Sequence, residues 1–344
     1  MRSPTSDLFK VEDILDAGRG VVASQRIPDG ILVLDSQAPA AHVIFRQYRR
    51  EVCAHCFHYD LGRTLPVRDN DTGKVFCSSQ CQATWRENHG ELALEAWRAL
   101  HAFLQTKSKA IVDIYSIAPL TPKPGVEQIE NKWRLVNEPA HLGPNASLQS
   151  KDELAMKGRR KMKQSSLPSK IYPDILGFLT TGILYHYSHP DAWQGVLSLA
   201  MDETPYKSTE DLEAHCNSFL QLRQILPHAL QSSCSTAVCR ILADAGSHNA
   251  FGIRSGSEDG EEYMGYGLYT AASYFNHSCS PNITKRRVGS SWEFRTASDV
   301  EPGEECCITY LGGDEKDLTV AERRARLKEV WGFVCMCVRC NAEG

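Results

Sequence analysis

Two groups of closely spaced cysteines most strongly limit what this chain can fold into. The first consists of Cys53-x-x-Cys56 and Cys77-x-x-x-Cys81, two thiol pairs separated by a loop. Such short spacings bring both sulfurs of a pair to the same side of a turn, and four thiolates complete a closed tetrahedral Zn²⁺ site. A closed site leaves no position for water, so we expect a structural zinc ion here. Four unrelated buried cysteines are the alternative.

The second group, Cys335-x-Cys337-x-x-Cys340, is one ligand short of a tetrahedral zinc site. A fourth ligand must come from elsewhere in the chain, and Cys279 is the best candidate. We expect the other five cysteines to be buried as small hydrophobic side chains. These are Cys216, Cys234, Cys239, Cys306 and Cys307.

Composition limits the class of protein and its compartment. Thirteen cysteines in a chain whose N-terminus, MRSPTSDLFKVED, has no apolar h-region indicate metal binding rather than disulfides. No stretch approaches the roughly 18 apolar residues that span a bilayer, so we expect a nuclear or cytoplasmic protein with no membrane partner. The net charge of −4 disfavours a protein that coats nucleic acid, although a local basic patch is compatible with it. His55, His58 and His89 could replace a ligand of the first cysteine group, but we expect surface histidines.

Hydrophobic periodicity and turn residues predict β elements at both ends of the chain and a helical block between them. Strands are expected within 11–35 and at 252–254, 266–269, 292–295 and 307–310. Helices are expected at 82–104, 171–187, 209–228 and 234–244, and again from about 319. The polar stretch 141–170 is expected to be a mobile loop. Its basic run 157–163 is a nuclear-import signal, a contact for acidic chromatin partners, or a solvated part of that loop.

Two short motifs precede the second cysteine group. The first is Asn276-His277-Ser278-Cys279-x-Pro281-Asn282, and the second runs from Gly303-Glu304-Glu305 to Ile308-Thr309-Tyr310. Read physically, Asn276 and His277 could orient a ligand. His277 and Cys279 would share one face of an extended strand, so a thiol nucleophile beside a base is an alternative. A nearby thiolate group that lacks one ligand explains Cys279 better.

In combination these motifs resemble the SET-domain lysine methyltransferases. Asp16-Ala17-Gly18-Arg19-Gly20 matches the opening turn of that domain, and the cysteine finger that splits the N-terminal strands from the rest resembles the SET-and-MYND branch. The resemblance covers about 11–100 and 245–344. It implies an α+β protein: a mainly β SET fold of small sheets with a pseudoknot, an inserted zinc finger and a helical insertion.

The resemblance also implies domain boundaries. These are 1–50 for the N-terminal part of the SET domain, 51–90 for the MYND-like finger, 91–245 for the helical insertion, 246–312 for the catalytic part and 313–344 for the post-SET zinc segment. A full MYND finger binds two zinc ions through eight ligands, whereas this chain retains the first four. The helical repeat domain that often follows the post-SET cysteines is not expected either, so the resemblance is to a short form.

Residue by residue, the resemblance assigns a cofactor site, a catalytic residue and two zinc sites. Tyr310 matches the catalytic tyrosine, and Cys279 would complete a Zn²⁺ site with Cys335, Cys337 and Cys340. The residues that would contact S-adenosylmethionine are Ala17, Gly18, Arg19, Asn249, Asn276, His277, Tyr310, Trp331 and Phe333. Ile308 is aliphatic where some relatives carry a residue that limits the product, which leaves room for more than one methylation.

The function expected from these residues is methyl transfer from S-adenosylmethionine to a lysine of a histone or another protein, with two structural Zn²⁺ ions. We expect a monomer that has a protein substrate and a possible chromatin association. One alternative is a SET-fold zinc adaptor without turnover, against which the retention of Tyr310 speaks. Another is a nucleic-acid-binding zinc protein, which the net acidity disfavours.

Overall fold

The computed structural model describes residues 4–113, 121–138, 168–255 and 262–344. Within them, small antiparallel sheets and helices make an α+β fold, as expected. Most of the predicted loop 141–170, with its basic run 157–163, lies outside the described residues. No described helix is both long enough and apolar enough to cross a membrane.

Strands from the two ends of the chain pair with each other. One sheet has the order β3-β10-β9 and a second the order β4-β8-β7, so each joins an N-terminal strand to two strands from the last hundred residues. β1 and β2 form a separate hairpin, and β5 pairs with β6. The bounds are β1 Phe9–Ile14, β2 Gly18–Ala23, β3 Leu32–Asp35, β4 Ala41–Ile44, β5 Val67–Arg68, β6 Val75–Phe76, β7 Ala250–Arg254, β8 Tyr263–Leu268, β9 Ile283–Val288 and β10 Ser291–Thr296.

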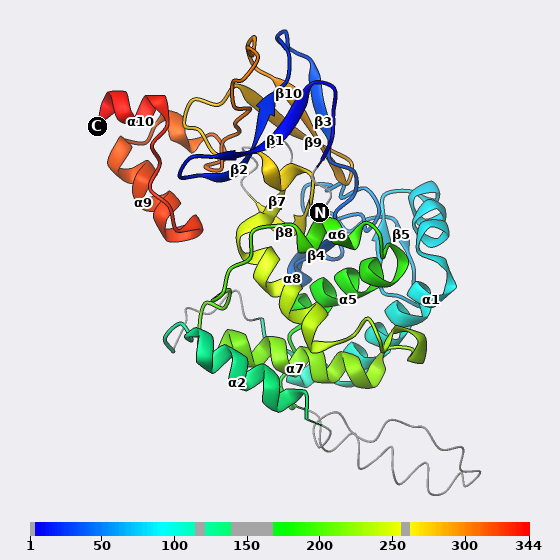
Figure 1. Ribbon diagram of the computed structural model, residues 1–344. Helices are drawn as coiled ribbons and strands as arrows, with labels where there is room; N and C mark the ends of the chain where they lie inside the picture. Colours follow the sequence, from blue (N-terminus) through cyan, green and yellow to red (C-terminus); the bar gives the residue numbers. More distant parts are fainter. Residues whose placement is uncertain (1–3, 114–120, 139–167, 256–261) are drawn as a thin grey trace, which may run out of the picture.

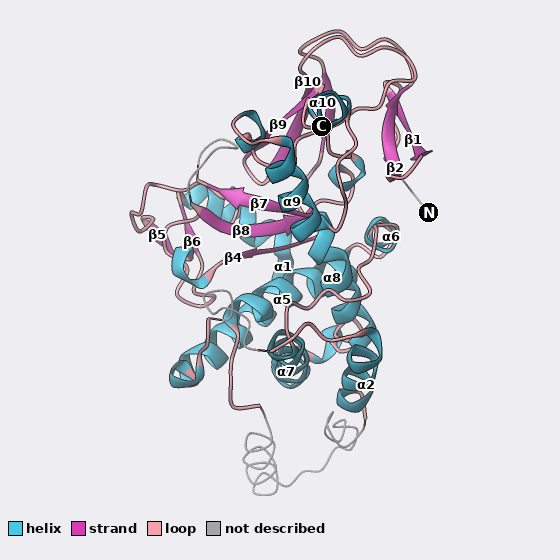
Figure 2. Cartoon of the chain, turned by 90° about the vertical axis from the view of Figure 1, so that its left-hand side faces the viewer, coloured by secondary structure: helices cyan, strands magenta, loops and turns pink. Residues whose placement is uncertain are grey.

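Between β6 and β7 the described residues form helices and loops, and two more helices lie at the C-terminal end of the chain. Figures 1 and 2 show most strands gathered at one end of the molecule with α9 and α10, and α2 and α7 at the opposite end. The α-helices are α1 Ser79–Thr106, α2 Val126–Val136, α5 Pro173–Ser188, α6 Trp193–Leu197, α7 Thr209–Ile225, α8 Thr236–Asn249, α9 Val320–Trp331 and α10 Val338–Glu343. Short 3₁₀ turns link several of these elements.

Helix α5 holds the helical block against the SET sheets. Pro173 occupies its first turn, where the missing N–H costs nothing, and the next three turns are buried all round because the sequence there is almost entirely apolar. At Gly177 the helix comes close to β4: an added Cβ would lie 3.6 Å from Val43 and 3.2 Å from the Arg49 guanidinium. The insertion is thus packed directly on a sheet of the SET domain.

The predicted helices and most of the predicted strands are confirmed. The strand expected at 307–310 is wrong: Ile308 makes only an isolated parallel bridge to His277. The segment is extended, but it lies between β2 and the chain around Asn276. Cys306 N–H donates to Val21 O (2.8 Å), and Ile308 N–H donates to Asn276 O (2.9 Å). Each neighbour is engaged over too short a stretch to form a ladder, although the segment's residues favour β structure. Helices α2, α6 and α10 were not expected.

Candidate active site

The β1–β2 hairpin presents the turn that the motif predicted. Gly18 has φ +73°, and a Cβ added there would meet no atom within 4 Å, so this turn borders open space. Gly20 is different, because its Cβ would lie 2.5 Å from Glu305 Oε1 and 2.8 Å from Asn276 Nδ2. Only glycine lets β2 approach the Asn276 side chain this closely.

Asn276 is fixed by its amide nitrogen. Nδ2 donates to Glu305 Oε1 (2.8 Å) and to the backbone oxygen of Arg19 (3.3 Å). Among the described residues, nothing donates to its amide oxygen. The Arg19 guanidinium does not extend into open space: it donates to Ser198 O and lies 5.1 Å from the centre of the Tyr274 ring. Arg19 therefore ties the hairpin to the helical insertion.

Asn249 is the last residue of α8 and is held in the same way. Its Nδ2 donates to Ala245 O and to Ala200 O, both at 2.8 Å. Its amide oxygen receives no hydrogen bond from any described residue. Ala200 and Ser198, which bonds Arg19, belong to one short segment after α6. The helical insertion thus positions two of the expected cofactor residues through backbone carbonyls.

His277 uses both ring nitrogens within the protein. Nδ1 accepts a hydrogen bond from the Tyr310 backbone N–H (3.0 Å), which can only donate, so the ring proton is on Nε2. Nε2 lies 3.2 Å from Cys279 Sγ, where it can donate to a thiolate. Burial, with the positive charges of Lys285 and Arg323, lowers the pKa of His277 to about 4 and keeps the ring neutral.

Tyr310 is anchored at its hydroxyl. The O–H donates to Phe275 O (2.9 Å), and burial raises the pKa of the phenol further above its ordinary value. Aromatic rings surround it: Trp331 at 5.2 Å, His277 at 5.4 Å and Phe333 at 6.4 Å between ring centroids. The expected catalytic and aromatic residues are therefore neighbours in space. Ala17, by contrast, engages only the turn, where its N–H donates to Ile14 O.

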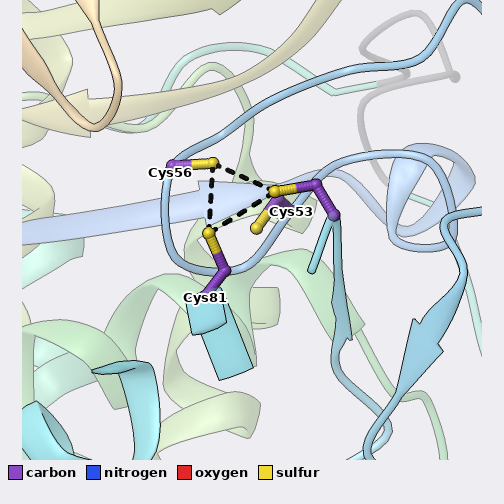
Figure 3. Close-up of side chains that lie close together, drawn as sticks. Cys53, Cys56 and Cys81 are labelled. Atoms are coloured by element: carbon purple, nitrogen blue, oxygen red, sulfur yellow. Dashed lines mark hydrogen bonds between the residues drawn. The ribbon is translucent and has the colours of Figure 1, made fainter. Parts of the chain in front are cut away.

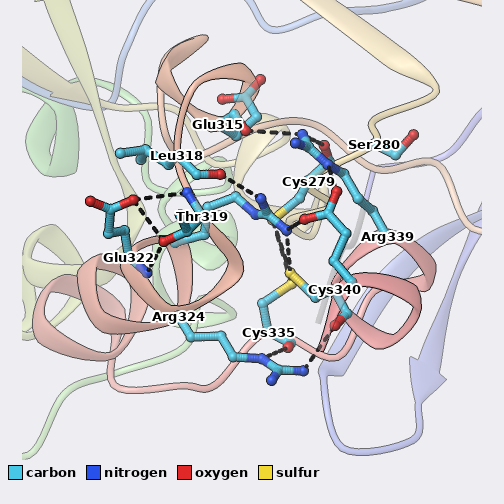
Figure 4. Close-up of polar contacts among 12 residues, drawn as sticks. Cys279, Ser280, Glu315, Leu318, Thr319, Glu322, Arg324, Cys335, Arg339 and Cys340 are labelled. Carbon is cyan, nitrogen blue, oxygen red and sulfur yellow. Dashed lines mark hydrogen bonds and ion pairs between the residues drawn. The ribbon is translucent and has the colours of Figure 1, made fainter.

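The second cysteine group comes together as predicted. The sulfurs of Cys279, Cys335, Cys337 and Cys340 all lie within 4.8 Å of one another, which fits a tetrahedral zinc ion. Two arginines reinforce the cluster: Arg323, fully buried, donates to Cys340 Sγ (3.4 Å), and Arg339 donates to Cys279 O (3.3 Å). Figure 4 shows this network of polar contacts around the thiols. Positive charge beside thiolates favours their ionised, metal-binding form.

The first cysteine group also comes together. Cys53, Cys56, Cys77 and Cys81 lie within the same 4.8 Å limit, and Figure 3 shows the sulfurs of Cys53, Cys56 and Cys81 directed toward one another. Helix α1 starts here, because the side chain of Ser78 accepts the N–H of Cys81 (3.1 Å). This cap fixes the helix relative to one zinc ligand.

Two side-chain expectations need correction. His89 is not a surface histidine: it stacks on Trp85 at 4.3 Å between ring centroids, and burial lowers its pKa to about 4. It lies one helical turn after Trp85, so the two rings meet. Cys307 is half-buried, whereas the other four non-ligand cysteines are buried as expected. His58 is exposed and His55 is half-buried.

A cleft of about 2290 Å³ runs from Tyr310 to the zinc finger. Tyr310, Ile308, Ser273 and Asn249 line it at one end, and residues of the finger and of α1 line it at the other. The cleft gives Tyr310 access to a ligand while the rest of its ring stays packed.

Sequence comparison identifies the fold family. A family profile described as "SET domain" matches residues 18–311. The chain belongs to the SET-domain family. It is 26% identical to the potential protein lysine methyltransferase SET6 of Saccharomyces cerevisiae, over 98% of this chain and 96% of that protein. It is 23% identical to the histone-lysine N-methyltransferase ASHR2 of Arabidopsis thaliana, over 98% of this chain and 72% of that protein.

Similarity to the SET-and-MYND proteins is confined to a segment. The histone-lysine N-methyltransferase SMYD3 of Homo sapiens is 39% identical over 23% of this chain and 18% of that protein. The SET-domain resemblance is thus confirmed over most of the chain, and the SET-and-MYND likeness over part of it.

Several groups that build the site were missed by the sequence analysis. Glu305 stood in a quoted motif, yet nothing indicated that its carboxylate accepts from Asn276. Phe275 O, Ser198 O and Ala200 O are backbone atoms, and no side-chain pattern shows where a carbonyl points. Nothing in the sequence pattern indicated that Arg323 is buried and donates to Cys340 Sγ.

Proposed function

We propose that this SET-domain protein is a protein-lysine N-methyltransferase that uses S-adenosylmethionine. The observation that carries the proposal is the Tyr310 hydroxyl, fixed by Phe275 O and opening on a cleft beside two asparagines whose amide oxygens have no described donor. The yeast relative is described as a potential protein lysine methyltransferase, and the plant and human relatives as histone-lysine N-methyltransferases. These names support the same reaction class.

The residues fit the donor chemically. Asn249 and Asn276 direct their amide N–H groups into the protein, which leaves both amide oxygens as acceptors for an ammonium group. The open space at Gly18 and the aromatic rings of Trp331 and Phe333 suit the remaining, partly apolar bulk of such a ligand. S-adenosylmethionine, when bound, supplies a methyl group on a positively charged sulfur. Arg19 and the His277 ring would act on it indirectly, because their polar atoms are already engaged.

Tyr310 would align the reaction rather than accept a proton. Its pKa is raised by burial, so the phenol stays neutral at physiological pH and is a poor base. With its proton given to Phe275 O, the hydroxyl oxygen turns lone pairs toward the cleft, where they can orient an amine and stabilise developing positive charge. Positioning of this kind lowers the barrier of an in-line displacement.

The substrate amine must be neutral before it can attack. Lys285, Arg254 and Arg287 line the same cleft. Positive charges and a partly apolar wall both disfavour the ammonium form of an incoming lysine, so its pKa falls and the neutral amine becomes more populated. The two sets of four thiolates would each hold a structural Zn²⁺, since neither leaves a coordination position for substrate.

Methyl transfer from radiolabelled S-adenosylmethionine to histones and to a whole-cell extract tests the proposal, with Tyr310→Phe as the matched variant. Loss of the hydroxyl should reduce turnover by roughly a hundredfold or more. Calorimetric affinity for the cofactor should change by less than about threefold, because the ring and its packing remain. A variant within a few-fold of wild-type turnover contradicts the role of Tyr310.

The same titration separates the enzyme from a non-catalytic adaptor. A protein that binds S-adenosylmethionine and transfers the labelled methyl group to a substrate is an enzyme. A protein that neither binds the cofactor nor transfers the methyl group is an adaptor. A protein substrate that presents a lysine, a chromatin association, a monomeric state and a nuclear or cytoplasmic localisation are further parts of the proposal, and they rest on the sequence.

A further inference from the structure

The cleft has a charge opposite to that of the chain as a whole. The protein has 38 Lys and Arg against 42 Asp and Glu. Among the residues that line the cleft there are 11 Lys and Arg but 5 Asp and Glu. An acidic protein that lines this cleft with positive charge is arranged to attract an anion, because a concave surface of one sign concentrates the field. The basic lining residues are Arg46, Arg49, Arg50, Arg68, Lys74, Lys123, Lys207, Arg254, Lys285, Arg287 and Lys328.

Lys74 lines this cleft and belongs to the finger. Its ammonium lies 3.5 Å from the centre of the Trp97 ring, and no carboxylate among the described residues forms an ion pair with it. The charged neighbour that most affects it is Arg49, whose own guanidinium is held by Ile44 O and Asp174. Burial disfavours the ammonium form of Lys74; the face of the Trp97 ring offsets part of this cost, and an anionic ligand would offset more of it.

Two buried hydrogen-bonding groups at the same end also lack partners. The indole N–H of Trp97 has no acceptor among the described residues, although the side chain is only 5% exposed. The hydroxyl of Thr72, 5% exposed, is unpartnered as well. Both residues line the cleft next to Lys74. Buried N–H and O–H groups are nearly always satisfied, so unsatisfied donors beside an unpaired cation indicate an acceptor that the chain itself does not provide.

From these observations we propose that Lys74, Trp97 and Thr72 form an anion-binding subsite that takes a carboxylate from an acidic segment of the protein substrate. The inference rests on the proposed function, since the subsite and Tyr310 line one cleft. It specifies a substrate class: a lysine that stands in an acidic sequence, rather than in the strongly basic sequence of a histone tail. A single carboxylate side chain can reach the floor of a cleft, which the backbone of a nucleic acid duplex cannot enter.

The groups that face Lys74 leave it as the residue that titrates near neutral pH. Burial, with the charge of Arg49, lowers the pKa of Lys74 to about 7. On β4, burial lowers the pKa of His42 to about 3, and on α1 it lowers that of His89 to about 4. Burial lowers the pKa of His101 as well. Arg68 adds to this lowering at His101, and the nearby Asp69 is paired with Arg86.

Equilibrium binding of three synthetic peptides, each about fifteen residues long with one central lysine, tests the proposal. The flanks carry glutamate in the first peptide, arginine in the second, and serine and glycine in the third. Binding is measured by fluorescence anisotropy on the full chain without cofactor, so the result does not depend on turnover. The glutamate peptide should bind roughly tenfold more tightly than the neutral one, and the arginine peptide should bind most weakly.

Lys74→Gln should remove the preference for glutamate, and Trp97→Phe, which keeps a ring but deletes the N–H, should reduce it. Lys316→Gln, an exposed lysine outside the cleft, should retain it. Below about pH 7 Lys74 is charged, so binding of the glutamate peptide should strengthen from pH 8 to pH 6 in the wild type but not in Lys74→Gln.

Equal binding of the three peptides, or a glutamate preference that survives in Lys74→Gln, overturns the subsite. If a short duplex DNA binds in a Lys74-dependent manner and the glutamate peptide does not, the basic residues of the cleft bind nucleic acid instead of an acidic peptide. Methylation of the same peptides is measured separately. Charge-selective binding without methyl transfer supports the subsite and contradicts the enzyme assignment. Methyl transfer without charge selectivity supports the enzyme assignment and contradicts the subsite.

Discussion

The two cysteine groups have the same four sulfur ligands but different connections to the rest of the molecule. The first, at the start of α1, contacts a helix cap and the packed aromatic residues of the finger. The second includes Cys279, two residues after His277, whose ring bridges from that sulfur to the backbone of Tyr310. The comparison shows that the second group is connected to the proposed catalytic tyrosine through one side chain, whereas the described contacts of the first group stay within the finger.

The largest difference is expected when one ligand is removed from each group. Cys279→Ser should abolish measurable cofactor binding and methyl transfer, a loss of at least roughly a hundredfold, because it loosens His277 and the aromatic rings around Tyr310. Cys81→Ser should also release one zinc ion but should retain cofactor affinity at low temperature. Calorimetry and zinc content by mass spectrometry, on both variants, measure the two losses. Equal losses of cofactor affinity would erase the distinction between the groups.

The next effect separates the two nitrogens of His277. In His277→Asn the amide can occupy the Nδ1 position and still accept from Tyr310 N–H, whereas in His277→Gln it reaches only the Nε2 position beside Cys279. We expect Asn to preserve kcat within about tenfold while zinc dissociates faster, and Gln to keep the zinc but lose more of kcat. Steady-state kinetics and the rate of zinc transfer to a chelator measure this. Identical profiles for the two variants would show that the ring only fills space.

Arg323 gives an intermediate effect that is specific to the second group. Arg323→Met keeps the length of the side chain but removes the charge beside Cys340 and the hydrogen bond to Leu318 O. Zinc should leave the second group roughly tenfold faster, while the first group keeps its metal. Arg339→Met is the variant for comparison, since Arg339 donates to the backbone oxygen of Cys279 in the same group. An unchanged rate of zinc loss in Arg323→Met contradicts this account of the buried guanidinium.

The smallest effect is expected at the first group. Ser78→Ala deletes the cap of α1 and should lower the free energy of unfolding by about 1 kcal/mol. Turnover at 25 °C should not change, because no contact among the described residues leads from this cap to Tyr310. Thermal unfolding of Ser78→Ala is compared with that of Ser78→Gly, because glycine at an N-cap position destabilises a helix less than alanine does. A smaller loss of stability in Ser78→Gly identifies the missing cap as the cause. A fall in kcat without a fall in stability would link the first group to the reaction after all.

Much of the fold and of the site could be predicted from the sequence. The spacing of the cysteines indicated both clusters, and the motifs around Asn276 and Tyr310 placed the catalytic region within the correct fold family. The extended segment at 307–310 was misjudged because strand propensity does not say whether neighbouring chains run alongside for long enough to form a ladder. His89 was misjudged because a single histidine carries no signal of the tryptophan ring that covers it.

The sequence by itself determined which groups are available: eight thiols in two sets, two asparagines, a tyrosine and a histidine. Local spacing decides how the thiols are grouped, because short-range chain geometry restricts which sulfurs can bind one metal ion. Only the tertiary structure decided what each polar atom contacts. Arg19 is engaged by a carbonyl of the insertion and His277 by the thiol of Cys279, and no carboxylate of the described residues forms an ion pair with Lys74 in the basic cleft. The contact of Arg19 with Ser198 joins residues that are 179 positions apart in the chain, and packing alone brings them together.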